Sequence, residues 1–587
     1  MLSFSFNPVT AVLAYAASVT GSMLGLFCTA RARIVQRGER ARWLVLAAFS
    51  IGGTGIWVMH FVAMLGSDVG RMPMNYEVST TILSAIMAIS VVAVGVFIVG
   101  FTKGFVWILV GGLFTGSGVA IMHYVGMSAL TMYGSIQYNA GLVALVVCLL
   151  VIGVGVVGET RTTLPPLTSG PARGPLTVSA NGRYFATPDG IPVLLTGAHT
   201  WQNLQDTGFT DPPPRFDYQA YLDRVTANGQ NFFRLWTWEQ ARYSVEIAND
   251  SYFTAPSPYA RTGPGLAIDG KPRFDLASFD PGYFSRLRTR VQQAGARGVY
   301  VSVMLFNGWS LQARKGDEAK NNPWKGHPYN AANNVNGVDG DVDGNGSGDE
   351  VHTLASPRVT ELQERYVRKV IDTVGDLGNV LYEIANEGPE DSGPWQYQMI
   401  NYVKAHDNHP VGMTAIYPDG DNRTLWDSPA DWISPNGDLD NPPPRTGAKV
   451  VLADTDHLCG LCGDREWPWK SFTRGENPIY MDAYDGAYGI GGDLDDRDAI
   501  AIRANLGYVR RFANRMDLLT ALPRPDLCST TYCLAGPEEY LVFSQGGGFT
   551  VEVDTDGLTG EWFSLDSATI TPAEVSWESD EEEAPSD

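Results

Sequence analysis

The sequence is short of basic residues, cysteine and histidine, and each shortage narrows the possible functions. Its 587 residues hold 42 Lys and Arg against 64 Asp and Glu, a formal net charge of −22. An acidic surface of this kind argues against nucleic acid as a partner. Six cysteines are too few for a disulfide scaffold in a chain of this length. No His-Glu-x-x-His motif occurs among the eight histidines, so nothing predicts a zinc protease.

The first 158 residues differ from the rest in composition. They contain seven basic and three acidic residues, which leaves 35 basic and 61 acidic residues, a net charge of −26, for the remainder. Five apolar stretches fill this part, at 8–30, 42–65, 79–101, 105–128 and 140–157. Each is close to the roughly 20 residues that cross a bilayer as a helix. We therefore predict an α-helical membrane domain of five spans over residues 1–158, with the lipid bilayer as its partner.

A Met-His motif occurs twice in this domain, near the ends of the second and fourth spans. An ionisable residue inside a span marks a candidate functional site, and imidazole and thioether groups suit copper. The alternative is a pair of packing faces, each with a hydrogen-bonded histidine. The candidate copper ligands are His60, Met64, His123 and Met127.

This segment resembles the MHYT family of bacterial integral-membrane sensor domains, which is named for the Met-His-Tyr motif. The resemblance implies a protein of the bacterial inner membrane. It also implies copper binding at His60 and His123, and sensing of oxygen, carbon monoxide or nitric oxide. The family pattern has three motif copies and more spans, whereas residues 1–158 hold two copies. The completeness of the metal site therefore stays open.

A linker rich in Pro, Gly and Thr follows at 159–175, and the apolar runs beyond it shorten to strand length. These runs alternate with helical stretches, which is typical of a parallel α/β fold. We predict a (β/α)8 TIM barrel over residues 176–526. Its expected strands are 192–196, 232–235, 299–305, 380–385, 411–416, 431–434, 450–453 and 479–481.

The fourth expected strand ends on Asn386 and Glu387, at the end of a barrel where catalytic residues lie. A glutamate against a half-apolar wall can act as a general acid, and the asparagine can bind a sugar hydroxyl. Glycoside hydrolysis needs a second carboxylate facing the first. The seventh strand offers Asp454 or Asp456, and Asp482 after the eighth is a third candidate.

Polar and aromatic residues follow the other expected strands at the same end of the barrel. Arg234 could hold a facing carboxylate ionised, as a nucleophile requires. Flat aromatic faces suit sugars, although cores also use them. The predicted substrate-binding residues are His199, Trp201, Arg234, Trp236, Trp238, Asn307, Asn386, His457, Asp482 and Tyr484.

This part is similar to clan A glycoside hydrolases, whose acid/base glutamate follows an asparagine at the end of strand four. Their nucleophile is usually a glutamate ending strand seven, whereas Asp454-Thr-Asp456 stands there in this chain. The strings at 454–458 and 477–482 are closest to bacterial barrel proteins whose C-terminal module is labelled a collagen-binding domain of a collagenase. The resemblance implies an O-glycosyl hydrolase with a carbohydrate substrate. The alternative is a membrane sensor with a non-catalytic, carbohydrate-binding barrel.

The connection after the third expected strand contains a pattern typical of calcium loops. It fits Asp-x-Asp-x-Asp-Gly-x5-Glu without a gap, so one cation would neutralise carboxylates that otherwise repel one another. The alternative is a solvated loop rich in Gly and Asp. We predict a structural calcium site at Asp339, Asp341, Asp343, Asn345, Ser347 and Glu350.

Residues 527–573 alternate polar with apolar residues between Gly-rich turns, which predicts a small all-β sandwich module. An acidic tail follows at 574–587. The side of the membrane that the barrel occupies stays open. Arginines between the first two spans favour a cytoplasmic loop, so five spans would leave the barrel in the cytoplasm. Calcium loops and polysaccharide hydrolysis favour the outside, which indicates a miscounted span or a fusion of two unrelated gene fragments.

Overall fold

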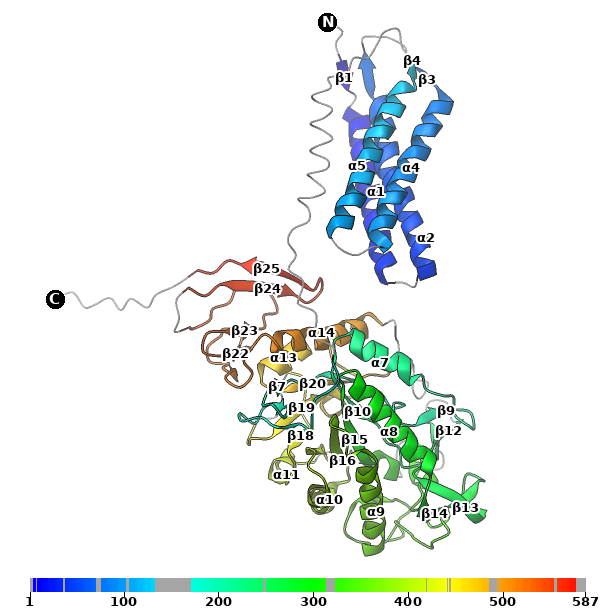
Figure 1. The fold of residues 1–587 in the computed structure, drawn as a ribbon, viewed down its shortest axis with the longest axis vertical. Coiled ribbons are helices and arrows are strands. Elements are labelled where there is room, and N and C mark those ends of the chain that lie inside the picture. Colours follow the sequence, from blue (N-terminus) through cyan, green and yellow to red (C-terminus); the bar gives the residue numbers. More distant parts are fainter. Residues whose placement is uncertain are drawn as a thin grey trace, which may run out of the picture. The chain divides into compact units, whose positions relative to one another are not determined.

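The computed structural model describes residues 4–131 and 170–576, which form two compact units (Figure 1). Within these ranges short gaps lie at 7, 35–36, 70–74, 102–104, 246–249, 313–321, 419, 441, 443–444, 485–493, 495 and 554–556. The units are Met1–Arg161 and Thr162–Asp587, and each is described by itself. The predicted fifth span, most of the linker and most of the acidic tail lie outside the described residues.

The N-terminal unit is a bundle of long apolar helices. These are α1 (Pro8–Ile34), α2 (Arg37–Ala48), which continues through the π-helical stretch η1 (Phe49–Val58) into α3 (Met59–Leu65), then α4 (Val78–Phe101) and α5 (Phe105–Ser128). Short strands pair in antiparallel fashion near the helix ends: β1 (Phe4–Phe6) with β2 (Ser67–Val69), and β3 (Asn75–Tyr76) with β4 (Leu130–Thr131).

Three segments of these helices are long and apolar enough to cross a membrane: Val9–Thr29, Arg40–Leu65 and Val78–Val99. They coincide with the first three predicted spans, and the fourth predicted span lies in α5. Small residues let the helices approach closely, because a Cβ on Gly21 or on Gly52 would collide with the neighbouring helix backbone. Large apolar side chains instead point outward, as expected for a surface that contacts lipid.

The C-terminal unit contains an eight-stranded parallel sheet, so the predicted TIM-barrel fold is confirmed. The strand order is β10-β15-β16-β17-β18-β19-β20-β8. Asn231 closes the gap between the first and last strands, because its N–H donates to Thr196 O and its side-chain oxygen accepts from Thr196 N, each at 3.0 Å. In chain order the strands are β8 (Gly197–His199), β10 (Phe232–Leu235), β15 (Tyr300–Asn307), β16 (Val380–Asn386), β17 (Val411–Thr414), β18 (Trp432–Ser434), β19 (Val450–Asp454) and β20 (Asn477–Met481).

The prediction for the first barrel strand was wrong. The apolar run at 192–196 splits: β7 (Pro192–Val193) belongs to a small antiparallel sheet with β5 (Thr177–Val178) and β6 (Phe185–Ala186), and β8 enters the barrel only at Gly197. Gly197 permits this placement, because a Cβ there would collide with the backbone carbonyl of Phe232 on β10. An apolar run reports burial, and both segments of this run are covered.

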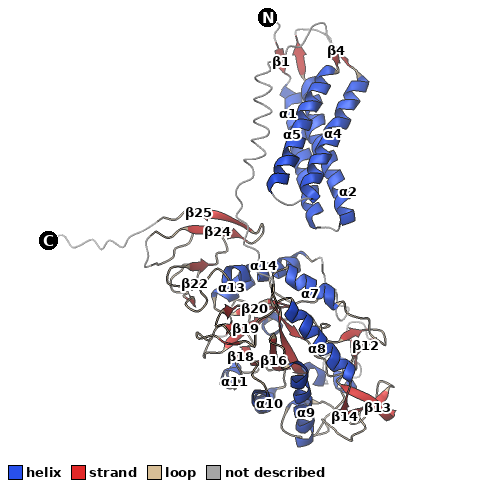
Figure 2. Ribbon diagram, in the orientation of Figure 1, coloured by secondary structure: helices blue, strands red, loops and turns tan. Residues whose placement is uncertain are grey.

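Helices surround the sheet on its outer side, as Figure 2 shows. Aspartate or serine side chains accept hydrogen bonds from the free N–H groups at the starts of several of them, including Asp217 before α7 and Asp280 before α8. The outer helices are α7 (Tyr218–Ala227), α8 (Pro281–Ala296), α9 (Pro357–Val374), α10 (Gly393–His406), α11 (Asn422–Asp427), α13 (Trp467–Thr473) and α14 (Arg497–Ala513).

Insertions extend the end of the barrel where the strands stop. A three-stranded sheet follows the first two barrel strands, a hairpin precedes α8, and a long connection with three 3-10 turns joins β15 to α9. The added strands are β9 (Asp206–Gly208), β11 (Arg242–Val245), β12 (Asp250–Ala255), β13 (Tyr259–Leu266) and β14 (Pro272–Phe279). The turns are η2 (Gly308–Leu311), η3 (Pro323–Gly326) and η4 (Asp349–His352), and η5 (Glu390–Ser392) follows β16.

Two small antiparallel sheets make up the C-terminal all-β part, which packs against the barrel helices. Leu534, Phe543 and Ile570 share an apolar core with Trp469 of α13 and Phe512 of α14. The sheets are β21 (Leu522–Pro523), β22 (Cys533–Ala535) and β23 (Tyr540–Val542), and β24 (Gly560–Ser564) with β25 (Thr569–Ala573).

Candidate active site

Arg234 on β10 is the centre of a buried polar network inside the barrel mouth. A guanidinium group has five N–H donors. Five oxygen atoms accept hydrogen bonds from the guanidinium group of Arg234. Its acceptors are Glu383 Oε1 and Oε2 at 2.6 and 2.9 Å, Asn386 Oδ1 at 2.6 Å, Asp454 Oδ2 at 3.0 Å and Asp456 Oδ2 at 2.8 Å. One side chain of the second strand therefore ties together groups from the fourth and seventh strands.

The charges of this network stabilise one another. Burial by itself would lower the pKa of Arg234, but Glu383, Asp454 and Asp456 raise it well above its usual value. Burial works to raise the pKa of Asp454, yet His199 and Arg234 outweigh it and hold this pKa below its usual range. Asp454 is therefore an ionised carboxylate at neutral pH.

The two aspartates after β19 have different environments. Asp454 is fully buried: its side chain bonds His199 Nε2 at 3.1 Å, and it accepts from Asp456 N at 3.0 Å as the cap of the short helix α12 (Thr455–Leu458). The Asp456 side chain is 6% exposed, and Arg234 is its hydrogen-bonded cation. Asp454 thus holds the local structure, while Asp456 lies nearer the opening.

Asn386 is oriented from two sides. Besides Arg234, the Nε2 of His457 lies 3.2 Å from Asn386 Oδ1, and the other ring nitrogen of His457 lies 2.7 Å from the Ser434 hydroxyl. Burial lowers the pKa of His457, so the ring is neutral, donates to Asn386 and accepts from Ser434. These bonds occupy the amide oxygen of Asn386 and identify its NH2 group as the donor end.

Glu387 follows directly and adopts an unusual backbone conformation. Its φ of 46° lies in the left-handed region, which costs a residue with a Cβ about 1–2 kcal/mol. The side chain is half-buried, and Gln312 Nε2 donates to its Oε2 at 3.4 Å. Gly308 lies against the Glu387 carbonyl, where any Cβ would collide. Strain held in place by close packing of this kind is common at functional sites.

Several other predicted residues are engaged elsewhere. Both carboxylate oxygens of Asp482 bond Arg503 at 2.7 Å. Tyr484 packs on Phe216 and Tyr221 beside α7. Asn307 bonds the backbone at Thr237 and Trp309.

The predicted tryptophans gather in one cluster. Trp201, Trp236 and Trp238 pack with Met304 and Met481 in a buried group. His199 stacks on Trp236 with ring centroids 5.4 Å apart. Among the described residues, His199 Nδ1 and Trp236 Nε1 are buried without a hydrogen-bond partner.

Two acidic residues of the site were not among the predicted catalytic or substrate-binding residues. Glu383 lies within β16 and pairs with Arg234. The sequence signal for Glu383 was a single charged residue inside the apolar run 380–385. Glu239, after β10, accepts from His327 Nε2 at 3.1 Å, from His352 Nε2 at 3.0 Å and from Asn307 N at 2.7 Å. These bonds tie the long connection before α9 to the barrel.

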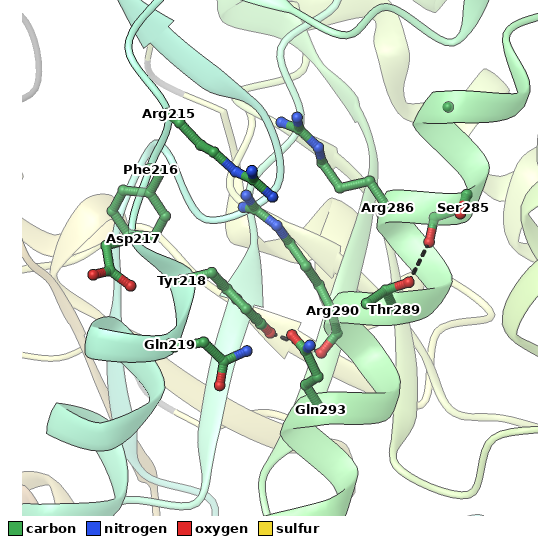
Figure 3. Close-up of a pocket in the computed structure, with 11 residues that line it drawn as sticks. Arg215, Phe216, Asp217, Tyr218, Gln219, Ser285, Arg286, Thr289, Arg290 and Gln293 are labelled. Carbon is green, nitrogen blue, oxygen red and sulfur yellow. Dashed lines mark hydrogen bonds between the residues drawn. The ribbon is translucent and has the colours of Figure 1, made fainter.

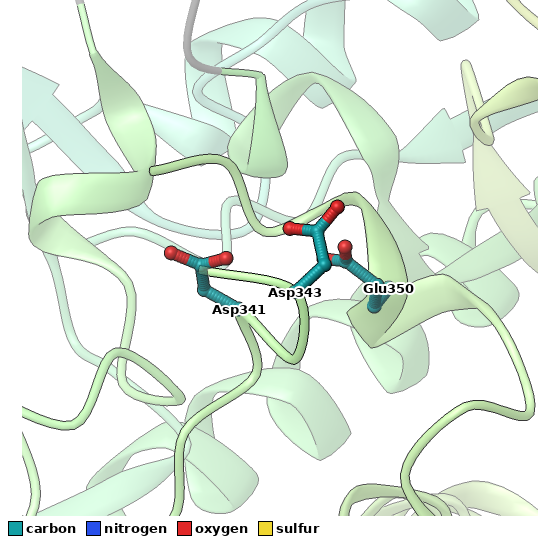
Figure 4. A group of neighbouring side chains, drawn as sticks. All are labelled: Asp341, Asp343 and Glu350. Carbon is teal, nitrogen blue, oxygen red and sulfur yellow. The ribbon is translucent and has the colours of Figure 1, made fainter. Parts of the chain in front are cut away.

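The predicted calcium loop lies in that connection, between His327 and His352. The carboxylates of Asp341, Asp343 and Glu350 converge, with one oxygen of each within 4.8 Å of the others (Figure 4). Glu350 Oε2 is buried without a hydrogen-bond partner among the described residues. Burial raises the pKa of Glu350, and the Asp343 and Asp341 charges add to this rise. A divalent cation fits this donor set.

The predicted copper ligands of the membrane unit also come together in part. The rings of His60 and His123 lie 4.9 Å apart, from α3 and α5. His60 Nε2 is buried without a hydrogen-bond partner in the described part of the chain. Met64 is buried on the same helix as His60. Two imidazoles and a nearby thioether fit a copper ion.

The N-terminal unit matches the family described as "Bacterial signalling protein N terminal repeat", MHYT, over residues 53–112 and 116–167. It carries two MHYT repeats. The predicted resemblance is confirmed. With three membrane-capable helices in the described residues, the chain is an integral membrane protein, as predicted.

Curated relatives match in the same region. The chain is 33% identical over 157 residues to the bifunctional diguanylate cyclase/cyclic di-GMP phosphodiesterase MucR of Pseudomonas aeruginosa, covering 26% of this chain and 22% of MucR. It is 32% identical over 146 residues to an uncharacterized signaling protein of Caulobacter vibrioides, covering 24% and 17%. The chain thus spans about a fifth of the length of these relatives.

Solved structures similar to the chain include a glycoside hydrolase family 5 protein from Bacteroides vulgatus ATCC 8482. Its TM-score is 0.45, with 13% identity, covering 68% of this chain and 87% of that chain. The barrel fold itself follows from the eight-stranded parallel sheet. The likeness of the C-terminal module to a collagen-binding domain stays a prediction.

Proposed function

We propose that the protein is a membrane-anchored glycoside hydrolase, with Glu387 as the acid/base and Asp456 as the facing carboxylate. One observation carries this proposal: Arg234 bonds Asp456 and also bonds Asn386, the residue before Glu387. The ends of the fourth and seventh strands are thereby held at one site. Of the two candidates on the seventh strand, Asp456 is favoured over Asp454, because Asp454 is buried and caps α12. The third candidate, Asp482, is bonded to Arg503 through both carboxylate oxygens.

The chemistry follows from the environments of the two carboxylates. Glu387 delivers a proton to the glycosidic oxygen, while the carboxylate of Asp456 acts on the anomeric carbon directly or through a water molecule. Arg234 holds the Asp456 carboxylate in place through a 2.8 Å hydrogen bond. The NH2 group of Asn386 donates to a sugar hydroxyl. Carboxyl groups about 5–5.5 Å apart would give retention and about 6.5–9.5 Å inversion, so NMR of the first-formed anomer distinguishes the two routes.

A glycan and aryl-glycoside panel tests the proposal on the full chain in detergent. Glu387→Gln and Asp456→Asn should each lower kcat by at least about 100-fold, because each removes one partner of the carboxylate pair. Glu390→Gln, a change at an exposed glutamate three residues away, is the matched control and should retain full activity. Carbohydrate binding by the unsubstituted protein without turnover on the whole panel would favour a non-catalytic barrel.

A second proposed function belongs to the membrane unit. We propose that His60 and His123, with Met64 and Met127, hold a copper ion and make this unit a sensor. The paired rings and the unpartnered His60 Nε2 favour it. Bound copper, measured by mass spectrometry on the detergent-solubilised chain, should fall in His60→Ala and His123→Ala. It should stay unchanged in His406→Ala, a control at an exposed histidine. Equal copper in all four proteins would exclude this site.

The calcium loop is the third proposed site. We propose that Asp341, Asp343 and Glu350 bind Ca²⁺ together with further oxygen ligands from the predicted set. The ion would lower the repulsion among these carboxylates and take up the unpartnered Glu350 oxygen. Its role is structural: it holds the connection that carries Gln312 to Glu387.

A further inference from the structure

A cavity of about 680 Å³ lies between α7 and α8, outside the candidate active site (Figure 3). Both helices follow barrel strands, so their first turns lie on the same rim as the strand ends. The cavity is lined by the start of α7, by one face of α8 from Gly282 to Gln293 and by the segment just before α7. Three arginines are among its lining residues: Arg215, Arg286 and Arg290.

Positive charge exceeds negative charge around this cavity. Arg290 is 6% exposed, and Asp206 lies 3.8 Å from it and 2.9 Å from Arg286. Burial, followed by the charge of Arg286, lowers the pKa of Arg290 to about 10. Asp217 also lines the cavity, but its carboxylate caps α7 by accepting from Ala220 N and points away from the guanidinium groups (Figure 3). Asp206 is thus the carboxylate that pairs with Arg286 and Arg290.

Arg215 is the arginine whose charge is least compensated. It is exposed, and no hydrogen bond or ion pair to it is found among the described residues. Its guanidinium nevertheless points toward those of Arg286 and Arg290 rather than away from them (Figure 3). An anion between these guanidinium groups would offset their mutual repulsion.

We propose that this cavity binds an oxyanion of charge −2, the phosphate group of a small polar organic molecule. Arg215, Arg286 and Arg290 carry a charge of +3, and Asp206 lowers it to +2 on the guanidinium side of the cavity, which matches a phosphomonoester dianion. Asp217, which points away from the guanidinium groups, brings the total to +1. Guanidinium forks suit phosphate oxygens. The cavity is larger than a phosphate group alone. Its remaining lining combines the aromatic rings of Phe216 and Tyr218 with polar side chains, which suits a hydroxylated body such as a sugar. The polar side chains are Gln219, Ser285, Thr289 and Gln293.

Binding to the full chain in detergent tests the proposal by calorimetry and by the shift in Tm. Inorganic phosphate and glucose 6-phosphate should bind and raise Tm, whereas glucose and, at equal ionic strength, chloride should not. Arg215→Ala and Arg286→Ala should each weaken phosphate binding about tenfold, the loss expected for one charge-assisted contact. Arg358→Ala is the matched control, because Arg358 is an exposed arginine on α9.

Two competition experiments distinguish the possible sources of the phosphate group. If glucose 6-phosphate competes with inorganic phosphate, the ligand is a soluble phosphorylated molecule. If a short-chain phosphatidic acid competes more strongly, the ligand is a lipid headgroup. Either result supports the site. Because Arg215 is exposed, Arg215→Ala is expected to fold. An unchanged Tm of this variant in the absence of ligand would verify this. Phosphate that stabilises no more than chloride, or that binds Arg215→Ala and Arg286→Ala as well as the unsubstituted protein, would overturn the proposal.

Discussion

Arg234 and Glu383 form two parallel hydrogen bonds of 2.6 and 2.9 Å, with side chains only 1% and 0% exposed. The pair joins the second and fourth barrel strands at the base of the candidate site. Because the same arginine also bonds Asp454 and Asp456, one cation serves three carboxylates. Removing one charged partner from such a network lowers the free energy of unfolding strongly, because the other charge stays buried without a partner.

Replacing Arg234 should therefore destabilise the fold strongly. Arg234→Met should lower the free energy of unfolding by about 3–5 kcal/mol, because it leaves buried carboxylates without their cation. Urea denaturation of the full chain, followed by tryptophan fluorescence, measures this. The control is Arg368→Ala, which removes a half-exposed pair with Asp372 and should cost about 0–1 kcal/mol. Similar losses in both variants would contradict a central role for Arg234.

Glu387 provides a test that separates activity from stability. Glu387→Gly should abolish hydrolysis and also raise the free energy of unfolding by up to about 1 kcal/mol, because glycine adopts a φ of 46° without strain. Glu387→Gln should abolish hydrolysis but leave the strain, so its stability should stay within about 0.5 kcal/mol of the original. Equal stability of the two variants would show that no strain is stored there.

Stability should fall at low pH through Glu239. Burial acts to raise the pKa of this carboxyl, but His352 and His327 outweigh it and lower the pKa from 4.5 to about 2. The folded state therefore binds this proton less readily than the unfolded state. The resulting stabilisation, on the order of 3 kcal/mol, is complete above roughly pH 4.5 and is lost as the pH falls toward 2.

Asp454, whose pKa is also lowered, contributes in the same direction. Glu239→Gln should flatten the loss of Tm between pH 5 and 3, as measured by thermal unfolding across this range. A variant with an unchanged slope would assign the acid sensitivity to other groups.

Terbium luminescence should report the calcium loop. Trp324 is buried against Gly340 and Gly348, at which a Cβ would collide with its ring, so a Tb³⁺ ion in the loop should be sensitised by this tryptophan. Calcium should displace Tb³⁺ and raise Tm, and a chelator should reverse both effects. Glu350→Gln should weaken binding, whereas Asp349→Asn removes a neighbouring charge outside the cluster and should not. Equal emission from both variants would argue against the site.

Much of the fold was predictable because apolar periodicity reports burial. Seven of the eight barrel strands lie at the predicted positions, and Glu387 follows the fourth as expected. The first strand was misplaced, because residues 192–193 of the apolar run belong to the small antiparallel sheet and the barrel strand β8 begins only after the run, at Gly197. Glu383 was missed for another reason: it lies inside the predicted strand rather than at its end, and its partner Arg234 is 149 residues away in the sequence.

By itself, the sequence determined the order of the parts: apolar spans with repeated Met-His motifs, then alternating strands and helices with polar residues at their ends. These properties are local, since they depend on residues within a few turns of one another. Only the tertiary structure decided which polar residues meet. Arg234 selects Glu383, Asp454, Asp456 and Asn386 because barrel closure brings three distant strand ends within hydrogen-bonding reach. The same closure engages Asp482 with Arg503 and leaves three arginines around a cavity between α7 and α8.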